Sequence, residues 1–252
     1  MKIDRVILAT DNNQEYYGFW PLVAKRWSSW GIKPELFVIA QNNLNIDDTL
    51  GNITYIKPIK GFSSAQQAQI VRFFGATKYK DEVCLISDID MMPLNKDYFV
   101  QNVADYDDNN IVFYSSDAYL PENPAYPAYP MCYMSAQGKT FEEIIKSNLS
   151  NFSLEFAEWM SHGHGWFTDE RVFFKKLDSW KANNQDRVVL LRRGFNMSND
   201  PQTIRRIDRG NNSNYNKHFL DKNFYVDYHM PRPYKKYKNV IDLVYNSTKL
   251  KE

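Results

Sequence analysis

Short apolar runs alternate with helix-forming segments over residues 1–115, and this alternation limits the possible folds more than any other feature. The runs are too short for helices and are bounded by polar or turn-forming residues, which is typical of strands. We predict strands at 5–10, 35–40, 53–56, 83–87 and 111–115, with helices at 16–30 and 63–79. Alternating strands and helices predict an α/β fold with a mostly parallel central sheet flanked by helices.

After residue 115 the sequence pattern changes. Residues 119–130 hold four prolines and three tyrosines, which excludes a helix and predicts a stiff loop. Further elements are predicted as strands at 131–135, 188–191 and 224–228, helices at 140–148, 154–160 and 168–180, and a polar loop at 196–216. No internal repeat or linker divides the chain, so its 252 residues predict a single domain.

Composition excludes several classes of protein. With 31 Lys and Arg against 30 Asp and Glu, the net charge of +1 argues against a nucleic-acid binder that works by bulk charge. No apolar stretch approaches about 18 residues, so no transmembrane helix is predicted, and the N-terminus predicts a first strand rather than a signal peptide. Cys84 and Cys132 lie in apolar runs and predict buried thiols. We expect a soluble, cytoplasmic protein whose basic tail, 232–238, makes at most peripheral membrane contact, with no signal for an oligomeric state.

A short acidic motif, Asp88-Ile89-Asp90, directly follows the apolar strand that ends at Ser87. Ligands of open parallel sheets bind beyond the carboxyl ends of the strands. Two carboxylates one residue apart can both turn toward a divalent cation, and Mg²⁺ and Mn²⁺ prefer oxygen ligands that they share with substrate phosphates. The motif therefore indicates metal-bridged phosphate binding, with two solvated loop acids as the simpler alternative.

The strand, the Asp-x-Asp motif and the apolar-Pro-Leu step that ends at Leu94 resemble the metal motif of GT-A glycosyltransferases. The nearest group is that of glycogenin and the bacterial lipopolysaccharide galactosyltransferases, and the resemblance spans most of the chain. It implies one GT-A-type, Rossmann-like domain over 1–252, with a nucleotide-sugar-binding half at 1–115 and an acceptor-binding half and tail at 116–252. The implied activity is that of a hexosyltransferase, which moves a sugar from a UDP- or GDP-linked donor to a hydroxyl acceptor such as a glycan.

Other positions follow the order of that family. Residues 9–11 end the first strand, where such enzymes hold the base and ribose, and Arg72 is the cation on the helix before the metal strand. In the family a late histidine completes the metal shell, and a lysine six residues later holds the diphosphate; here they are His229 and Lys235. The resemblance thus implies Mn²⁺ or Mg²⁺ on Asp88, Asp90 and His229, and donor binding by Ala9, Thr10, Asp11, Arg72, Ser87, Asp88, Ile89, Asp90 and Lys235.

The chain also departs from the family pattern. Arg232 stands where the family has a glycine, and the Pro-Trp pair that follows the family's lysine is missing. Arg72 can equally be a surface helix residue, Lys235 part of a solvated basic tail, and His229 a core or turn histidine.

The acidic pair Asp169-Glu170 matches in position the family's Asp-Gln near the transferred sugar, with Glu170 in place of glutamine. A carboxylate there would act as general base in an inverting enzyme, and would steady an oxocarbenium-like centre or act as nucleophile in a retaining one. The resemblance favours retention. Compensation of a helix dipole explains both acids as well.

Aromatic residues of the second half are candidates to pack against acceptor sugar rings, with core packing as the alternative; they are Tyr126, Tyr129, Tyr133, Trp159 and Trp166. We also place the His162–His164 loop near the acceptor. Two other functions remain open. One is a haloacid-dehalogenase-like phosphatase, whose Asp-x-Asp usually follows the first strand rather than the fourth. The other is a non-catalytic nucleotide- or carbohydrate-binding module.

Overall fold

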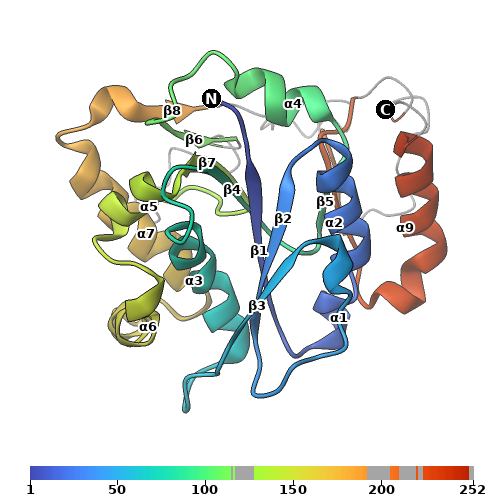
Figure 1. Ribbon diagram of the computed structural model, residues 1–252, viewed down its shortest axis with the longest axis horizontal. Helices are drawn as coiled ribbons and strands as arrows, with labels where there is room; N and C mark the ends of the chain where they lie inside the picture. Colours follow the sequence, from blue (N-terminus) through green and yellow to red (C-terminus); the bar gives the residue numbers. More distant parts are fainter. Residues whose placement is uncertain (115, 117–127, 192–204, 210–219, 221–223, 250–252) are drawn as a thin grey trace.

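The computed structural model describes residues 1–114, 116, 128–191, 205–209, 220 and 224–249. Its centre is a seven-stranded sheet with the strand order β3-β2-β1-β4-β7-β6-β8 (Figure 1). These strands are β1 (Arg5–Asp11), β2 (Lys33–Ile39), β3 (Asn52–Ile56), β4 (Val83–Ser87), β6 (Ile111–Phe113), β7 (Tyr133–Gln137) and β8 (Val188–Leu190). Among them β7 alone runs antiparallel to its neighbours. The predicted α/β fold with a mostly parallel sheet is confirmed.

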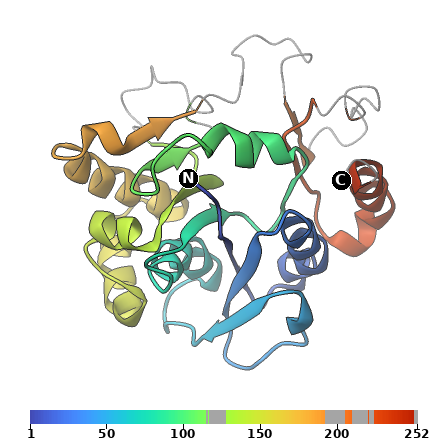
Figure 2. The same cartoon turned by 45° about the horizontal axis from the view of Figure 1, so that its top comes forward.

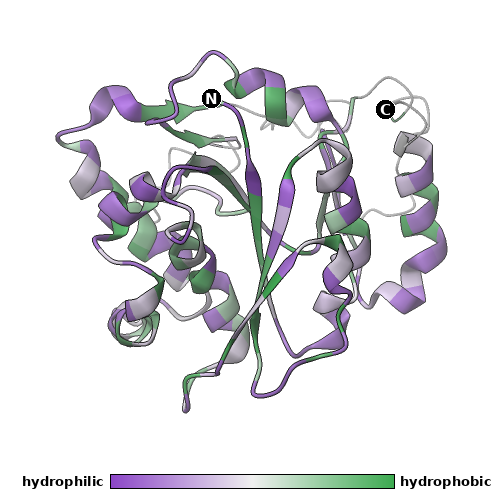
Figure 3. Ribbon diagram, in the orientation of Figure 1, coloured by the Kyte–Doolittle hydropathy of each residue, from purple (hydrophilic) through white to green (hydrophobic). Residues whose placement is uncertain are grey.

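Helices cover both faces of this sheet. One core lies beneath α3 (Ser64–Ala76), α5 (Gly138–Ile145), α6 (Phe152–Ser161) and α7 (Thr168–Lys181). The other lies beneath α2 (Trp20–Ser29), α4 (Lys96–Val100) and α9 (Tyr234–Lys249). Figure 2 shows α9 and the α5–α7 group on opposite sides of the sheet. In Figure 3 the turns of α9 alternate between apolar and polar colours, as expected of a helix with one buried face.

Each central strand supplies both cores because successive side chains of a strand point to opposite faces. In β1, Val6 and Leu8 belong to the core beneath α2. Ile7 and Ala9 belong to the core beneath α3. This two-sided burial explains why the strand is a continuous apolar run rather than an alternating pattern.

A second, small sheet ties the end of the chain to the end of β4. It has the order β5-β10-β9, formed by β5 (Met91–Pro93), β10 (Asp227–His229) and β9 (Arg206–Ile207). The antiparallel pairing of β5 with β10 sets His229 opposite Met91. Next to this pair, the backbone N–H of Met230 donates to the carbonyl oxygen of Asp90 at 2.8 Å. This sheet brings His229 to the acidic motif.

The structure differs from the predicted elements in several places. The helix predicted at 16–30 is two helices, α1 (Gln14–Tyr17) and α2, and Pro21 lies in the first turn of α2, where its missing N–H costs nothing. Within the polar, loop-dominated segment predicted at 196–216, the described residues 205–209 include the two-residue strand β9, and the rest of the segment lies outside the described part of the chain. The basic tail continues into helix α9, in which Ile241 and Val244 are buried one turn apart. Residues 117–127, including Tyr126, lie outside the described part of the chain.

None of the helices in the described ranges combines the length and the apolar character that crossing a bilayer requires. Cys84 and Cys132 are both buried, as predicted, and neither is in a disulfide.

Gly75 provides a test of how closely α3 packs on the sheet. A Cβ atom at this position would overlap the ring of Phe37 on β2, which is fully buried. Helix propensity alone predicts that Gly75→Ala stabilises the protein by about 1 kcal/mol. We expect instead a loss of about 1–3 kcal/mol in the free energy of unfolding, measured by urea denaturation, because overpacking outweighs propensity. Ser179→Ala, on the exposed face of α7, is the control and should stay within about 0.5 kcal/mol. A more stable Gly75→Ala variant would contradict the close packing.

Candidate active site

A pocket of about 510 Å³ lies at the carboxyl ends of β1 and β4. These strands are neighbours, but the order of the chain reverses between them, since β1, β2 and β3 step one way and β4 lies on the other side. Such a reversal leaves a crevice above the strand ends, where open α/β sheets bind their ligands. Ala9, Thr10 and Asp11 line it from β1, and residues 88–90 line it from the end of β4.

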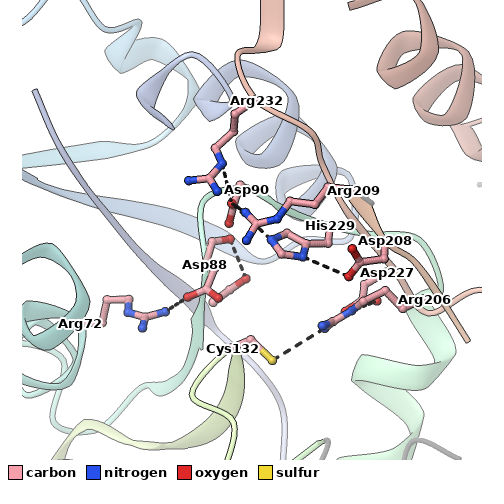
Figure 4. Close-up of polar contacts among 11 residues, drawn as sticks. Arg72, Asp88, Asp90, Cys132, Arg206, Asp208, Arg209, Asp227, His229 and Arg232 are labelled. Atoms are coloured by element: carbon pink, nitrogen blue, oxygen red, sulfur yellow. Dashed lines mark hydrogen bonds and ion pairs between the residues drawn. The ribbon is translucent and has the colours of Figure 1, made fainter. Parts of the chain in front are cut away.

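The acidic motif forms a tight turn after β4. The backbone N–H of Met91 donates to the carbonyl oxygen of Asp88 at 3.2 Å, and the side chain of Ile89 is buried in the core. As a result the two carboxylates have different partners (Figure 4). Asp88 faces Arg72 on α3, and Asp90 faces His229 on β10.

Arg72 connects three parts of the site. Its buried guanidinium forms an ion pair with Asp88 through Nη1, and its Nη2 lies 3.5 Å from Oδ2 of Asp169 at the start of α7. Its Nε donates to the carbonyl oxygen of Gln69 at 3.1 Å, which holds the side chain against its own helix. Burial raises the pKa of Asp169 from an ordinary 3.8 to about 6, and the charge of Arg72 opposes this rise.

Asp90 is surrounded by cationic groups. Its Oδ2 lies 3.5 Å from Nε2 of His229, 3.5 Å from Nη1 of Arg209 and 3.9 Å from Nε of Arg232 (Figure 4). The other ring nitrogen of His229, Nδ1, lies 3.3 Å from Oδ2 of Asp208. Burial alone would lower the pKa of His229, but the two carboxylates outweigh it and raise this pKa to about 9.

Most of the residues predicted for the site line this one pocket. They are Ala9, Thr10, Asp11, Arg72, Asp88, Ile89, Asp90, Asp169, Glu170 and His229. Ser87 and Lys235 do not line it: Ser87 is buried within β4, and Lys235 is exposed on α9. Thr168 is the first residue of α7, and its hydroxyl donates to the carbonyl oxygen of Gly165 at 2.8 Å.

Several pocket residues were missed by the sequence reasoning. Arg206 and Arg209 line the pocket from the segment 205–209, and Arg232 lines it from the turn before α9. Arg206 is held by Asp227, a fully buried carboxylate whose Oδ1 lies 2.9 Å from its Nε. An apolar residue between charged ones, as in Arg206-Ile207-Asp208, is a weak strand signal that could have located β9.

The aromatic candidates separate into pocket and core residues. Trp166 lines the pocket together with Phe167, and these two side chains are 53% and 52% exposed. For the other candidates core packing is the better description: Trp159 and Tyr133 are buried, and Tyr129 packs between Phe113 and Phe174.

The histidines of the loop before Trp166 are outside the pocket lining. His162 lies 3.0 Å from Oε1 of Glu158, and its ring is parallel to that of His164 at 6.1 Å. Gly163 and Gly165 have φ values of 71° and 59°, which favour glycine, so the loop makes a turn that presents Trp166 to the pocket.

The described residues include no group of three His, Cys, Asp or Glu side chains placed to hold a metal ion as they stand. Asp88 is paired with Arg72, and Asp90 with cationic groups. The donor chemistry nevertheless suits a hard or borderline cation, since a carboxylate oxygen of Asp90 and an imidazole nitrogen of His229 lie side by side. The contact of the other ring nitrogen with Asp208 is also typical of metal-binding histidines.

Neither a protein-family profile nor a curated protein matches the sequence. Several solved structures of glycosyltransferases are similar to this chain. One is the apo bifunctional enzyme WbbM, with 13% identity and a TM-score of 0.47; the match covers 96% of this chain and 50% of WbbM. Another is the galactosyltransferase LgtC in complex with donor and acceptor sugar analogues, with 13% identity and a TM-score of 0.48; this match covers 95% of each chain. A third is GlyE of Streptococcus pneumoniae TIGR4, with 13% identity and a TM-score of 0.43; the match covers 78% of this chain and 47% of GlyE. The chain therefore spans about half the length of WbbM and of GlyE. Identities of 13% and TM-scores below 0.5 leave the function to be inferred from the residues of the site.

The raised pKa of Asp169 predicts that this side chain lowers stability at neutral pH. The folded state favours the protonated acid. The stability that this protonation contributes is therefore fully present below about pH 4 and is lost as the pH rises through about 6. We expect Asp169→Asn to be more stable than wild type at pH 7.5, by on the order of 2–3 kcal/mol, and by only about 1 kcal/mol at pH 4.5. Urea denaturation at both pH values measures this, and Asp178→Asn, at an exposed position of α7, is the control. A less stable Asp169→Asn variant at pH 7.5 would mean that the pair with Arg72 is net stabilising.

Proposed function

We propose that the protein is a metal-dependent glycosyltransferase that moves a sugar from a UDP- or GDP-linked donor to a hydroxyl group of a glycan. One observation carries the proposal: at the reversal point of the sheet, a single pocket gathers carboxylates, an imidazole and guanidinium groups. A departing nucleoside diphosphate needs cationic partners, and a developing oxocarbenium centre needs carboxylates.

The end of β1 would bind the nucleoside. The carboxylate of Asp11 is held by the hydroxyl of Ser64 at 2.8 Å and by the backbone N–H of Asn13 at 3.0 Å. A carboxylate fixed in this way can accept hydrogen bonds from ribose hydroxyls. Ala9 leaves room for the base because its side chain is small.

Asp88, Asp90 and His229 are the residues that would hold Mn²⁺ or Mg²⁺. When bound, the ion supplies Lewis-acid neutralisation of the diphosphate. Arg232 is the cation best suited to hold the same group. Its guanidinium stacks over the ring of Tyr16 at 4.5 Å, which orients it, and faces the pocket beside Asp90.

In the transfer, the bond between the anomeric carbon and the phosphate oxygen breaks, and its electron pair leaves with the nucleoside diphosphate. The acceptor oxygen forms the new bond to the anomeric carbon and gives up its proton to a carboxylate or to the leaving phosphate. Asp169, held 3.5 Å from Arg72, and Glu170, half-buried at the pocket wall, are the carboxylates proposed to face the sugar. We favour retention of the anomeric configuration, with one of these acids stabilising the oxocarbenium-like centre.

Trp166 and Phe167 are proposed to receive the acceptor. They are half exposed at the wall of the pocket, next to Asp169 and Glu170 in the chain, so a sugar ring stacked on them would lie near the transferred group. Aromatic rings bind the apolar faces of sugars while leaving the hydroxyls free.

A metal-dependent thermal shift tests the donor class. Incubated with UDP-, GDP-, CMP- and dTDP-sugars, the protein should melt about 5–10 °C higher with one nucleotide at about 100 times its Kd, and only when Mn²⁺ is present. Asp90→Ala should abolish this shift, whereas Asp178→Ala, on the exposed face of α7, should keep it. Hydrolysis of the same donor should accompany binding. Turnover of para-nitrophenyl phosphate without donor hydrolysis would favour a phosphatase, and binding without any hydrolysis would favour a binding module.

The diphosphate cation can be identified with inorganic pyrophosphate and Mn²⁺, measured by calorimetry. We expect Arg232→Gln to weaken binding about 10- to 100-fold, the loss of a charged hydrogen bond of about 1.5–3 kcal/mol. Lys235→Gln should change the affinity less than about twofold, because Lys235 is exposed outside the pocket. The reverse result would assign the diphosphate to the lysine, as the family pattern implies.

A further inference from the structure

The ring of His229 lies between two carboxylates: that of Asp90, in the turn after β4, and that of Asp208, just after β9. Nε2 is 3.5 Å from Oδ2 of Asp90, and Nδ1 is 3.3 Å from Oδ2 of Asp208. The first contact is part of the proposed metal site. The second has no role in that site so far, because Asp208 does not line the pocket.

The register of the small sheet explains why Asp208 reaches the ring. β9 and β10 are parallel, with Arg206 beside Asp227. The same register, continued one residue past the end of β9, sets Asp208 beside His229. Residues that are neighbours in register point their side chains to the same face. The buried ion pair between Arg206 and Asp227 holds the two strands in this register.

We propose that Asp208 is a positioning residue for His229: its carboxylate accepts a hydrogen bond from Nδ1–H and so directs the lone pair of Nε2 to the side of Asp90. This inference rests on the metal-dependent function proposed above. A histidine that binds a metal through one nitrogen carries its proton on the other, and a carboxylate at that proton fixes both the tautomer and the ring orientation. Asp208 itself touches neither metal nor substrate in this arrangement.

Mn²⁺ affinity measures this role directly, without any turnover. Free Mn²⁺ is quantified by electron paramagnetic resonance in titrations of wild type, Asp208→Ala, Asp208→Asn and His229→Ala, with Mn²⁺ as the only ligand. We expect Asp208→Ala to weaken Mn²⁺ binding 10- to 100-fold, the usual effect of losing such a partner. Asp208→Asn should lose less, because the amide oxygen can still accept a hydrogen bond from Nδ1–H. Asp178→Ala removes an exposed acid elsewhere and should bind as wild type does.

The double variant Asp208→Ala/His229→Ala shows whether Asp208 affects Mn²⁺ binding through the ring of His229 or independently of it. If Asp208 acts through the ring, Asp208→Ala should cause no further loss once His229→Ala is in place. An equal loss in both backgrounds would overturn the inference, and so would an Asp208→Ala variant that binds Mn²⁺ within twofold of wild type. A wild-type protein that takes up no Mn²⁺ would instead remove the metal from the proposed function, and this inference with it.

A spectroscopic readout on the metal-free protein tests the contact itself. The chain has four histidines, so long-range proton–nitrogen correlation spectra are simple, and His229→Gln assigns the ring of interest. We expect a hydrogen-bonded Nδ1 proton on His229 in wild type and in Asp208→Asn, and its loss to solvent exchange in Asp208→Ala. Identical ring signals in wild type and Asp208→Ala would overturn the contact, whatever the metal affinities are.

Discussion

The buried guanidinium of Arg72 is the interaction on which the pocket depends. It lies between Asp88 at the end of β4 and Asp169 at the start of α7, so it fixes the positions of two acids from opposite halves of the chain. Asp169 is buried, and Arg72 is the cation that lies beside its carboxylate and also holds the partly exposed Asp88. The hydrogen bond from Arg72 to the carbonyl oxygen of Gln69 keeps that cation on α3, which itself packs tightly against β2 through Gly75.

The small sheet β5-β10-β9 determines which groups surround Asp90, the second acid of the motif. Because β10 pairs with β5 on one side and β9 on the other, Asp90 meets groups that come from near the end of the chain. Asp90 balances the charges of His229, Arg209 and Arg232. In the proposed function, a diphosphate would compete with Asp90 for these cationic groups.

The parts of the fold that depend on local sequence could be predicted, and those that depend on distant pairing could not. The apolar runs of β1 and β4 and the helix α3 carry their own signals, since burial on both faces or on one stripe is visible in a short window. β5 and β9 have three and two residues and pair with β10 on either side, so at most a weak local pattern marks them in the sequence. For the same reason Asp208 and Arg209 escaped notice, whereas His229 was found by resemblance alone. Trp159 and Trp166 look alike in the sequence, yet one packs in the core and the other at the pocket.

The mixture of charges in the pocket wall has a kinetic consequence. Acids and bases alternate over short distances around Asp90 and Arg72, so their fields largely cancel a few ångströms outside the opening. An anionic donor would therefore meet this protein at an unsteered, ordinary diffusional rate that depends little on ionic strength. The protein would therefore discriminate between ligands only after they enter the pocket, when a ligand replaces individual ion pairs of the pocket wall by direct contact.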